Sequence, residues 1–211
     1  MKAFTFFEIA VVLLVISLIL GVTLSFDAFN KKFFYLRDVA KNLSVALNIT
    51  SDLSQKIINK NNQFYCGYGI YFPTSTQFEA LAFSTSTNLC ELVFLNTTTI
   101  NTFIDNNLRR KTYILSNSDL VTSTIPSLSL NVNLKPGFEI VFSTSTNCSP
   151  DYQPPLIFMY FYSYTDLFFI FQQRENWTSI NTDKIYVCFK EKGKTLYKIK
   201  VNKLGQISFE Q

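Results

Sequence analysis

The chain of 211 residues contains no histidine. Histidine is the usual general base near neutral pH, a member of the serine hydrolase triad and a common zinc ligand. The sequence also lacks a C-x-x-C pair and a glycine-rich phosphate loop, since Cys66-Gly-Tyr-Gly has only two glycines and is typical of a closely packed strand. No nucleophile–base pair is visible, so we expect a protein that is not an enzyme and that uses no cofactor and no metal.

Formal charge is absent from Ile9 to Phe26, a run long enough to cross a bilayer as a helix. A cleaved secretory signal would end in small residues of the A-x-A kind, which this run lacks. A plain signal anchor would explain the length but not Glu8, the only formal charge between Lys2 and Asp27. An ionisable group at the centre of a membrane segment costs about 2.5–3.5 kcal/mol, so Glu8 is expected to have a function.

The residues around Glu8 read AFTFFE at positions 3–8, followed without a gap by apolar residues 9–14. This pattern resembles the class III signal of type IV pilins and type II secretion pseudopilins. The resemblance implies a leader of residues 1–3, cleavage between Ala3 and Phe4 by a prepilin peptidase, and N-methylation of Phe4. It implies assembly roles for Thr5 and Glu8. Ala3 stands where the family usually has glycine.

Glu8 has a physical role in such a pathway. Cleavage would leave a positive amine on Phe4 at the start of a helix that is packed among other helices. The Glu8 carboxylate of one subunit could meet the Phe4 amine of its neighbour, which turns two costly charges into one compensated pair and sets the axial register. The partners implied by the resemblance are the prepilin peptidase, other pilin or pseudopilin subunits and the assembly platform in the inner membrane.

The residues after the apolar run lack helix breakers, since no glycine or proline occurs between Phe26 and Ile58. Apolar residues recur there at helical spacing between charged ones. We therefore expect a membrane-spanning or filament-core helix over residues 4–26 and its amphipathic continuation over 27–58. The alternative is a break near residues 48–51, since Asn, Thr and Ser favour helix caps.

From residue 59 onward, after a loop predicted at 59–62, short β-branched and aromatic runs alternate with polar linkers, which predicts a mainly antiparallel β head over 59–211. The fold class is thus α+β, and the resemblance implies a pilin-like arrangement in which the long N-terminal helix packs on the head. A short helix is expected around Thr102–Arg109. The expected strands are 64–72, 78–84, 91–95, 112–115, 128–132, 138–142, 156–162, 167–172, 185–190, 196–201 and 206–209.

The four cysteines are Cys66, Cys90, Cys148 and Cys188. A head delivered outside the cytoplasm favours disulfides, and proximity in sequence suggests the pairs Cys66–Cys90 and Cys148–Cys188. Four buried free thiols are the alternative.

Lysines are concentrated near the C-terminus, where Lys190, Lys192, Lys194, Lys198 and Lys200 form a possible basic surface. On a strand, Lys198 and Lys200 share one face and Tyr197 and Ile199 the other. Electrostatic capture of DNA is one interpretation. The simpler one, which we favour, is a solvated edge that discourages aggregation.

Together these features predict a structural subunit, a minor pilin or pseudopilin, of a type IV pilus-like or type II secretion filament. We expect it in the inner (cytoplasmic) membrane as a single-pass protein with its head outside the cytoplasm, and then in a pilus or pseudopilus. The alternative is a membrane-anchored extracytoplasmic binding protein that never polymerises. Processing at Phe4 distinguishes the two, because a simple anchor keeps Met1.

Overall fold

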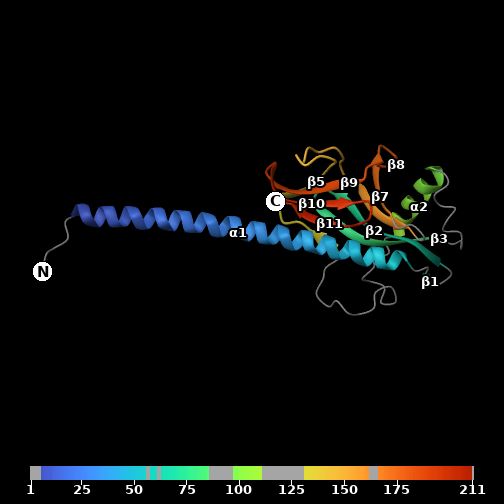
Figure 1. The fold of residues 1–211 in the computed structure, drawn as a ribbon, viewed down its shortest axis with the longest axis horizontal. Helices are drawn as coiled ribbons and strands as arrows, with labels where there is room; N and C mark the ends of the chain where they lie inside the picture. Colours follow the sequence, from blue (N-terminus) through green and yellow to red (C-terminus); the bar gives the residue numbers. More distant parts are fainter. Residues whose placement is uncertain are drawn as a thin grey trace. The chain divides into compact units, whose positions relative to one another are not determined.

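The computed structural model describes residues 6–55, 58–60, 63–85, 97–110, 131–161 and 166–210, and the statements below concern these residues (Figure 1). The chain divides into two compact units, with the boundary between Asp38 and Val39. The helices are α1 (Phe6–Ser54) and α2 (Thr97–Arg110). The strands are β1 (Ile58–Lys60), β2 (Gln63–Thr74), β3 (Gln77–Thr85), β4 (Asn131–Asn133), β5 (Phe138–Ser143), β6 (Leu156–Phe161), β7 (Leu167–Gln173), β8 (Asn176–Ser179), β9 (Lys184–Glu191), β10 (Lys194–Asn202) and β11 (Ile207–Glu210).

Helix α1 is continuous, so the alternative of a break near residues 48–51 is wrong. Thr50 Oγ1 donates to the Leu47 carbonyl at 2.8 Å and Ser54 Oγ to the Ser51 carbonyl at 2.7 Å. These hydroxyls bond inside the helix, although the same residue types often cap a helix end. The predicted apolar stripe is confirmed at Leu36, Val39, Leu43, Ala46 and Leu47, which are all buried, and is wrong at Phe29, which is exposed.

The predicted end of the helix at residue 58 is also wrong. Helix α1 ends at Ser54, and Ile58 begins β1, which pairs with the start of β2 in antiparallel register. The predicted loop at 59–62 is therefore partly strand, because pairing with β2 satisfies the backbone groups of residues 58–60. Residues 61 and 62 lie outside the described residues.

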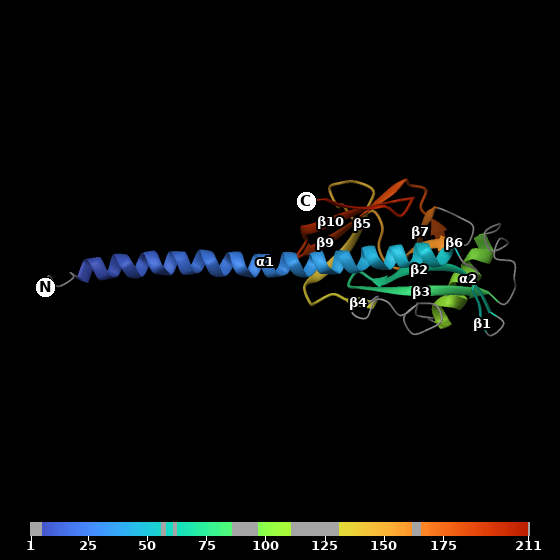
Figure 2. The same cartoon turned by 60° about the horizontal axis from the view of Figure 1, so that its bottom comes forward.

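Seven of the described strands form one antiparallel sheet in the order β4-β3-β2-β6-β7-β8, with β1 added beside β2. Figure 2 shows β2 and β3 side by side. One face carries the cluster that includes Phe83, Met159, Phe161 and Trp177, and Phe103 and Ile104 of α2 cover it. The prediction that Gly67 and Gly69 mark close packing is confirmed. A Cβ on Gly69 would lie 2.4 Å from the Phe158 carbonyl oxygen.

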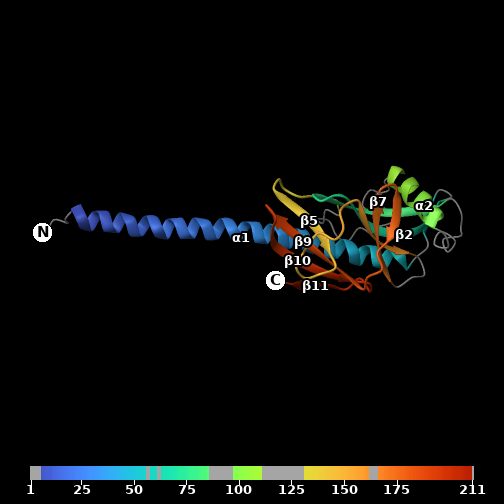
Figure 3. The ribbon, with the colours of Figure 1, turned by 90° about the horizontal axis from the view of Figure 1, so that it is seen from above.

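The other four strands form a second sheet in the order β11-β10-β9-β5, and Figure 3 shows β9 between β5 and β10. The two sheets meet through aromatic rings, with the centroids of Phe72 and Phe142 4.8 Å apart. The Ile140 amide also donates to the Ser75 carbonyl at 2.6 Å. The second unit is therefore one body with a shared core, and it contains no separate smaller domain among the described residues.

Most strand predictions are confirmed within a residue or two. Strands β2, β3, β5, β6, β7, β9, β10 and β11 lie where the alternating or apolar runs placed them, and α2 contains the predicted short helix. The predicted strands 91–95 and 112–115 lie outside the described residues, as do residues 128–130 and 162. Strand β8 was not expected, because NWTS offers only one large apolar side chain, Trp177.

Candidate membrane helix and lysine-rich sheet face

The first half of α1 is an apolar helix with no protein cover. Every side chain described between Phe6 and Leu24 is exposed, and the most apolar 18-residue window of α1 has none of its residues buried. By length and composition this is a helix that could cross a membrane. Exposure of large side chains along several turns is costly in water, so this surface requires lipid or other protein around it.

The polar side chains inside this apolar segment bond to the helix itself. Ser17 Oγ donates to the Leu13 carbonyl at 2.8 Å. Thr23 Oγ1 lies 3.0 Å from the Ile19 and Leu20 carbonyls. Hydroxyls satisfied in this way avoid the cost of an unpaired polar group in hydrocarbon. The segment can therefore enter lipid although it contains serine and threonine.

Glu8 lies in the first turn of α1 and its side chain is exposed. A carboxylate at this place is stabilised by the positive end of the helix dipole. The residues that complete the predicted processing and assembly motif, Ala3, Phe4 and Thr5, lie outside the described residues. Their spacing from Glu8 is known from the sequence alone.

The predicted alternation of side chains on β10 is confirmed. Tyr197, Ile199 and Val201 are buried, whereas Lys198 and Lys200 lie on the opposite face. Lys198 is paired with Cys188 on β9 and with Glu210 on β11, so these residues share its face. Lys192 lies in the turn between β9 and β10, Lys194 begins β10, and both are exposed.

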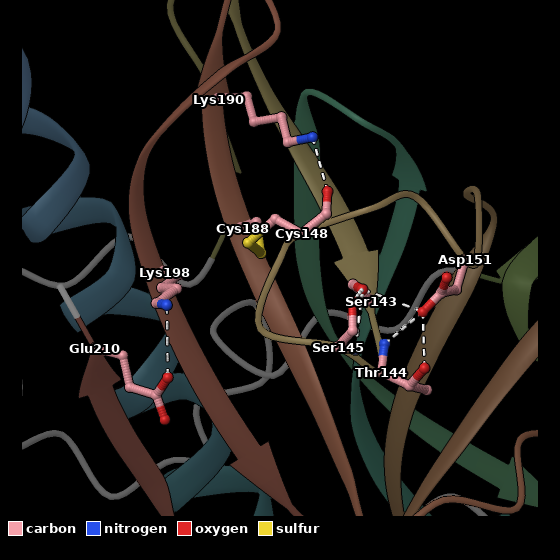
Figure 4. The surroundings of a disulfide bond; sticks show 9 residues. All are labelled: Ser143, Thr144, Ser145, Cys148, Asp151, Cys188, Lys190, Lys198 and Glu210. Atoms are coloured by element: carbon pink, nitrogen blue, oxygen red, sulfur yellow. Dashed lines mark hydrogen bonds and ion pairs between the residues drawn. A yellow bond between two sulfur atoms is a disulfide. The ribbon is translucent and has the colours of Figure 1, made fainter.

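The lysines of this face are not an uncompensated basic patch. The Glu210 carboxylate lies 3.8 Å from Lys198 Nζ and 3.9 Å from Lys200 Nζ. Lys190 Nζ donates to the Cys148 carbonyl oxygen at 2.8 Å (Figure 4). Acidic Glu191 lies beside Lys192 and pairs across the hairpin with Lys194. Strand β10 lies between β9 and β11, so the predicted solvated edge strand is wrong. The geometry favours a solvated, ion-paired sheet face over a groove for nucleic acid, which needs several cations facing one backbone.

A disulfide fastens the segment after β5 to this face. Cys148 is bonded to Cys188 across 40 residues (Figure 4). Both side chains are buried, with Val141 and Tyr186 packed around them. The predicted pairing of Cys148 with Cys188 is thus confirmed. Cys66 is disulfide-bonded, and its predicted partner, Cys90, lies outside the described residues. Alternative free thiols are excluded at Cys66, Cys148 and Cys188.

Asp151 holds the start of the same segment, and sequence reasoning missed it. One carboxylate oxygen accepts bonds from the Thr144 amide at 2.6 Å, Thr144 Oγ1 at 2.8 Å and Ser143 Oγ at 3.1 Å. The bonds from Thr144 keep the pKa of Asp151 below its ordinary value. The repeated FSTSTN at 83–88 and 142–147 was the available signal, because its second copy contains both donor residues, Ser143 and Thr144.

Among the described residues, no group of three Cys, Asp or Glu side chains is placed to hold a metal ion. An open groove of about 500 Å³ runs beside β5, and its lining includes Pro73, Glu139, Tyr152 and Lys190. Glu139 and Lys190 are direct cross-strand partners at its wall, and the Lys190 ammonium is bonded to the Cys148 carbonyl.

Comparisons with protein-family models, with curated proteins and with solved structures found no match to this chain. The α+β architecture is therefore supported by the structure alone, and the likeness to prepilins is supported only by the N-terminal residues quoted above.

Proposed function

We propose that the chain is a structural subunit, a minor pilin or pseudopilin, of a type IV pilus-like or type II secretion filament. One observation carries the proposal. A helix whose apolar half has no protein cover begins with a carboxylate at the offset of the prepilin motif and continues without a break toward a β-rich head. Membrane lipid before assembly and neighbouring helices after it would supply the missing cover.

The position of Glu8 fits this role. A carboxylate in the first exposed turn of an apolar helix is accessible to a cation on another copy of the helix. The nearest cation in the proposed pathway is the amine of Phe4 on the neighbouring subunit, created by cleavage after Ala3. In a low-dielectric filament core, each of these charges would be costly alone, so only the register that pairs them is favourable.

The disulfide supports a head outside the cytoplasm, because such bonds persist in oxidising compartments. The distribution of cations near the apolar run points the other way, since Lys31 and Lys32 follow it and only Lys2 precedes it. The rule that cations stay inside applies to short loops, whereas large domains translocate largely regardless of charge. A head of this size falls in the second class, so the disulfide is the stronger guide.

The pathway is tested by mass spectrometry of the N-terminus of the membrane-extracted protein, with the prepilin peptidase present and absent. We expect a chain that starts at N-methylated Phe4 only when the peptidase is present. An intact Met1 under both conditions would contradict the proposal and favour a membrane-anchored extracytoplasmic binding protein that does not polymerise.

The assembly role is tested separately with Glu8→Ala, and with Asp27→Asn as the matched loss of one carboxylate beyond the apolar run. We expect both variants to insert into the membrane. Only the Glu8 variant should fail to enter filaments when incorporation is followed by sedimentation of sheared fibres. Normal incorporation of Glu8→Ala would show that the carboxylate has no role in assembly.

A further inference from the structure

The residues directly after the apolar run form a distinct stretch of α1. The uncharged run from Ile9 to Phe26 has 18 residues, which corresponds to about 27 Å at 1.5 Å per residue. The hydrocarbon core of a bilayer is about 30 Å thick. Because α1 continues without a break, a helix that spans the bilayer with this run places the next turns at the depth of the lipid headgroups.

Two phenylalanines and two lysines are exposed in these turns. Phe29 is 50% exposed and Phe34 is 54% exposed. Lys31 and Lys32 are exposed between them. Lys32 follows Phe29 by three positions and Phe34 follows Lys31 by three, so each lysine lies one helical turn from an exposed ring. Aromatic rings with long cationic side chains are typical of the boundary between hydrocarbon and water.

We propose that Phe29, Lys31, Lys32 and Phe34 form a collar that binds the headgroups of anionic phospholipids. The Phe29 ring reaches the upper acyl region, the Phe34 ring lies among the headgroups, and the two ammonium groups contact lipid phosphates. The proposal rests on the membrane anchor of the proposed function and adds the lipid class that the anchor selects. The collar also holds the depth of the helix, because moving either lysine into hydrocarbon is costly.

Charge complementarity favours lipid over a protein partner. Residues 27–38 contain Lys31, Lys32 and Arg37 against Asp27 and Asp38, and the stretch from 28 to 36 contains the two lysines and no acidic residue. An anionic leaflet attracts such a segment by about 1 kcal/mol for each lysine or arginine near the surface. Since a large head translocates regardless of nearby charge, these lysines are not needed as a topology signal. Binding of phosphate headgroups gives them a role.

The depth of the collar is tested on the full chain in phosphatidylcholine vesicles that contain brominated lipids, which quench tryptophan at the depth of the bromine. Phe34→Trp reports the collar, and Leu14→Trp reports the apolar run. The unsubstituted chain gives the signal of Trp177, which is buried in the head. We expect bromines near the headgroup to quench Phe34→Trp most and bromines deep in the acyl chain to quench Leu14→Trp most.

These two reporters separate the collar from the anchor. Quenching of Leu14→Trp without quenching of Phe34→Trp would overturn the collar and leave the anchor intact, and a neighbouring protein would then cover Phe34. No quenching of either variant would overturn the membrane anchor itself, and the collar with it.

The lipid class is tested by comparing brominated phosphatidylglycerol with brominated phosphatidylcholine at equal mole fraction. We expect Phe34→Trp to be quenched more by the anionic lipid. In the Lys31→Gln/Lys32→Gln background this preference should fall by about fivefold for each lysine removed. The Lys192→Gln/Lys194→Gln background removes the same charge from the head and should leave it unchanged. Equal quenching by the two lipids, or a preference that survives loss of Lys31 and Lys32, would overturn anionic recognition.

Discussion

Gly205 is a residue at which a single added methyl group should be costly. Its φ is +71°, and a Cβ there would lie 1.5 Å from the Tyr160 hydroxyl oxygen. Gly205→Ala combines the penalty of a left-handed backbone with overpacking, so we expect the free energy of unfolding to fall by about 3 kcal/mol. Chemical denaturation of the head followed by circular dichroism measures this loss.

Gly193 provides the matched control for this substitution. Its φ is +78°, but no atom lies within 4 Å of the position of its Cβ. Gly193→Ala should therefore cost only the backbone term, about 1 kcal/mol. Equal losses in the two variants would mean that contact of the added methyl group with Tyr160 does not destabilise the head.

Two buried tyrosines should make the head sensitive to alkaline pH. Burial raises the pKa of Tyr160 to about 12 and raises that of Tyr68 further. Above the ordinary value of 10.0, the unfolded chain loses these protons while the folded chain keeps them. The unfolded state then binds fewer protons than the folded state. The contribution of these tyrosines to the free energy of unfolding is therefore fully present below pH 10 and falls as the pH rises toward 12.

The measurement is the melting temperature of the head between pH 9 and 12, compared with Tyr68→Phe and Tyr160→Phe. Removing both hydroxyls should flatten the decline. At neutral pH the variants should also differ. Tyr160 loses its hydrogen bond to Ser51, at about 1 kcal/mol, while the Tyr68 hydroxyl has no partner in the described structure and its loss should not destabilise. An unchanged pH profile in the double variant would exclude these tyrosines as the cause.

At the scale of elements, the sequence predicted the strands whose burial follows from the alternation of their own residues. Alternation in KTLYKIKVN gave β10 and the faces of its lysines, because burial of Tyr197 and Ile199 follows directly from a period of two. Strand β8 depends on contacts that sequence does not show. The Trp177 amide donates to Asn101 Oδ1 at 2.7 Å and its indole NH to Asp105 Oδ1 at 2.8 Å, both from α2. The role of Asp151 was hidden for the same reason, since its donors lie at Ser143 and Thr144 across a loop.

The segment between β5 and β6 should depend mainly on its disulfide. Closing a loop of 40 residues removes chain entropy from the unfolded state that corresponds to about 4 kcal/mol. Cys148→Ser/Cys188→Ser should lose most of this stability and open residues 144–150 to proteases. Substitution leaves the bond at Cys66 intact, which a reducing agent would not. Thermal unfolding with limited proteolysis tests both effects.

Lys190→Met separates the covalent bond from the hydrogen bond that accompanies it. This variant keeps the disulfide but removes the contact of Lys190 Nζ with the Cys148 carbonyl. We expect a loss of about 1 kcal/mol and no new cleavage. If it opens the segment as fully as the double cysteine variant does, the hydrogen bond and not the disulfide holds the segment.

At the scale of the whole molecule, the uncovered apolar helix should need detergent or lipid, whereas the head should be stable in water by itself. The large side chains of the apolar run are among the exposed ones, while the second unit has its own aromatic core around Phe72, Phe142 and Phe158. A chain that starts at Asp27 keeps the whole second unit and the buried Leu36. We expect it to be monomeric without detergent and to form the Cys148–Cys188 bond.

The full chain should require detergent or lipid, because its apolar window has none of its residues covered by protein. Size-exclusion chromatography with light scattering, with and without detergent, compares the two chains, and the melting temperature of the head should agree between them. Leu14→Lys/Ile16→Lys in the full chain interrupts the apolar surface without shortening the helix. Its need for detergent should therefore lie between those of the two chains. A full chain that stays monomeric in detergent-free buffer would show that water tolerates this helix, and it would remove the physical reason for both a membrane anchor and a filament core.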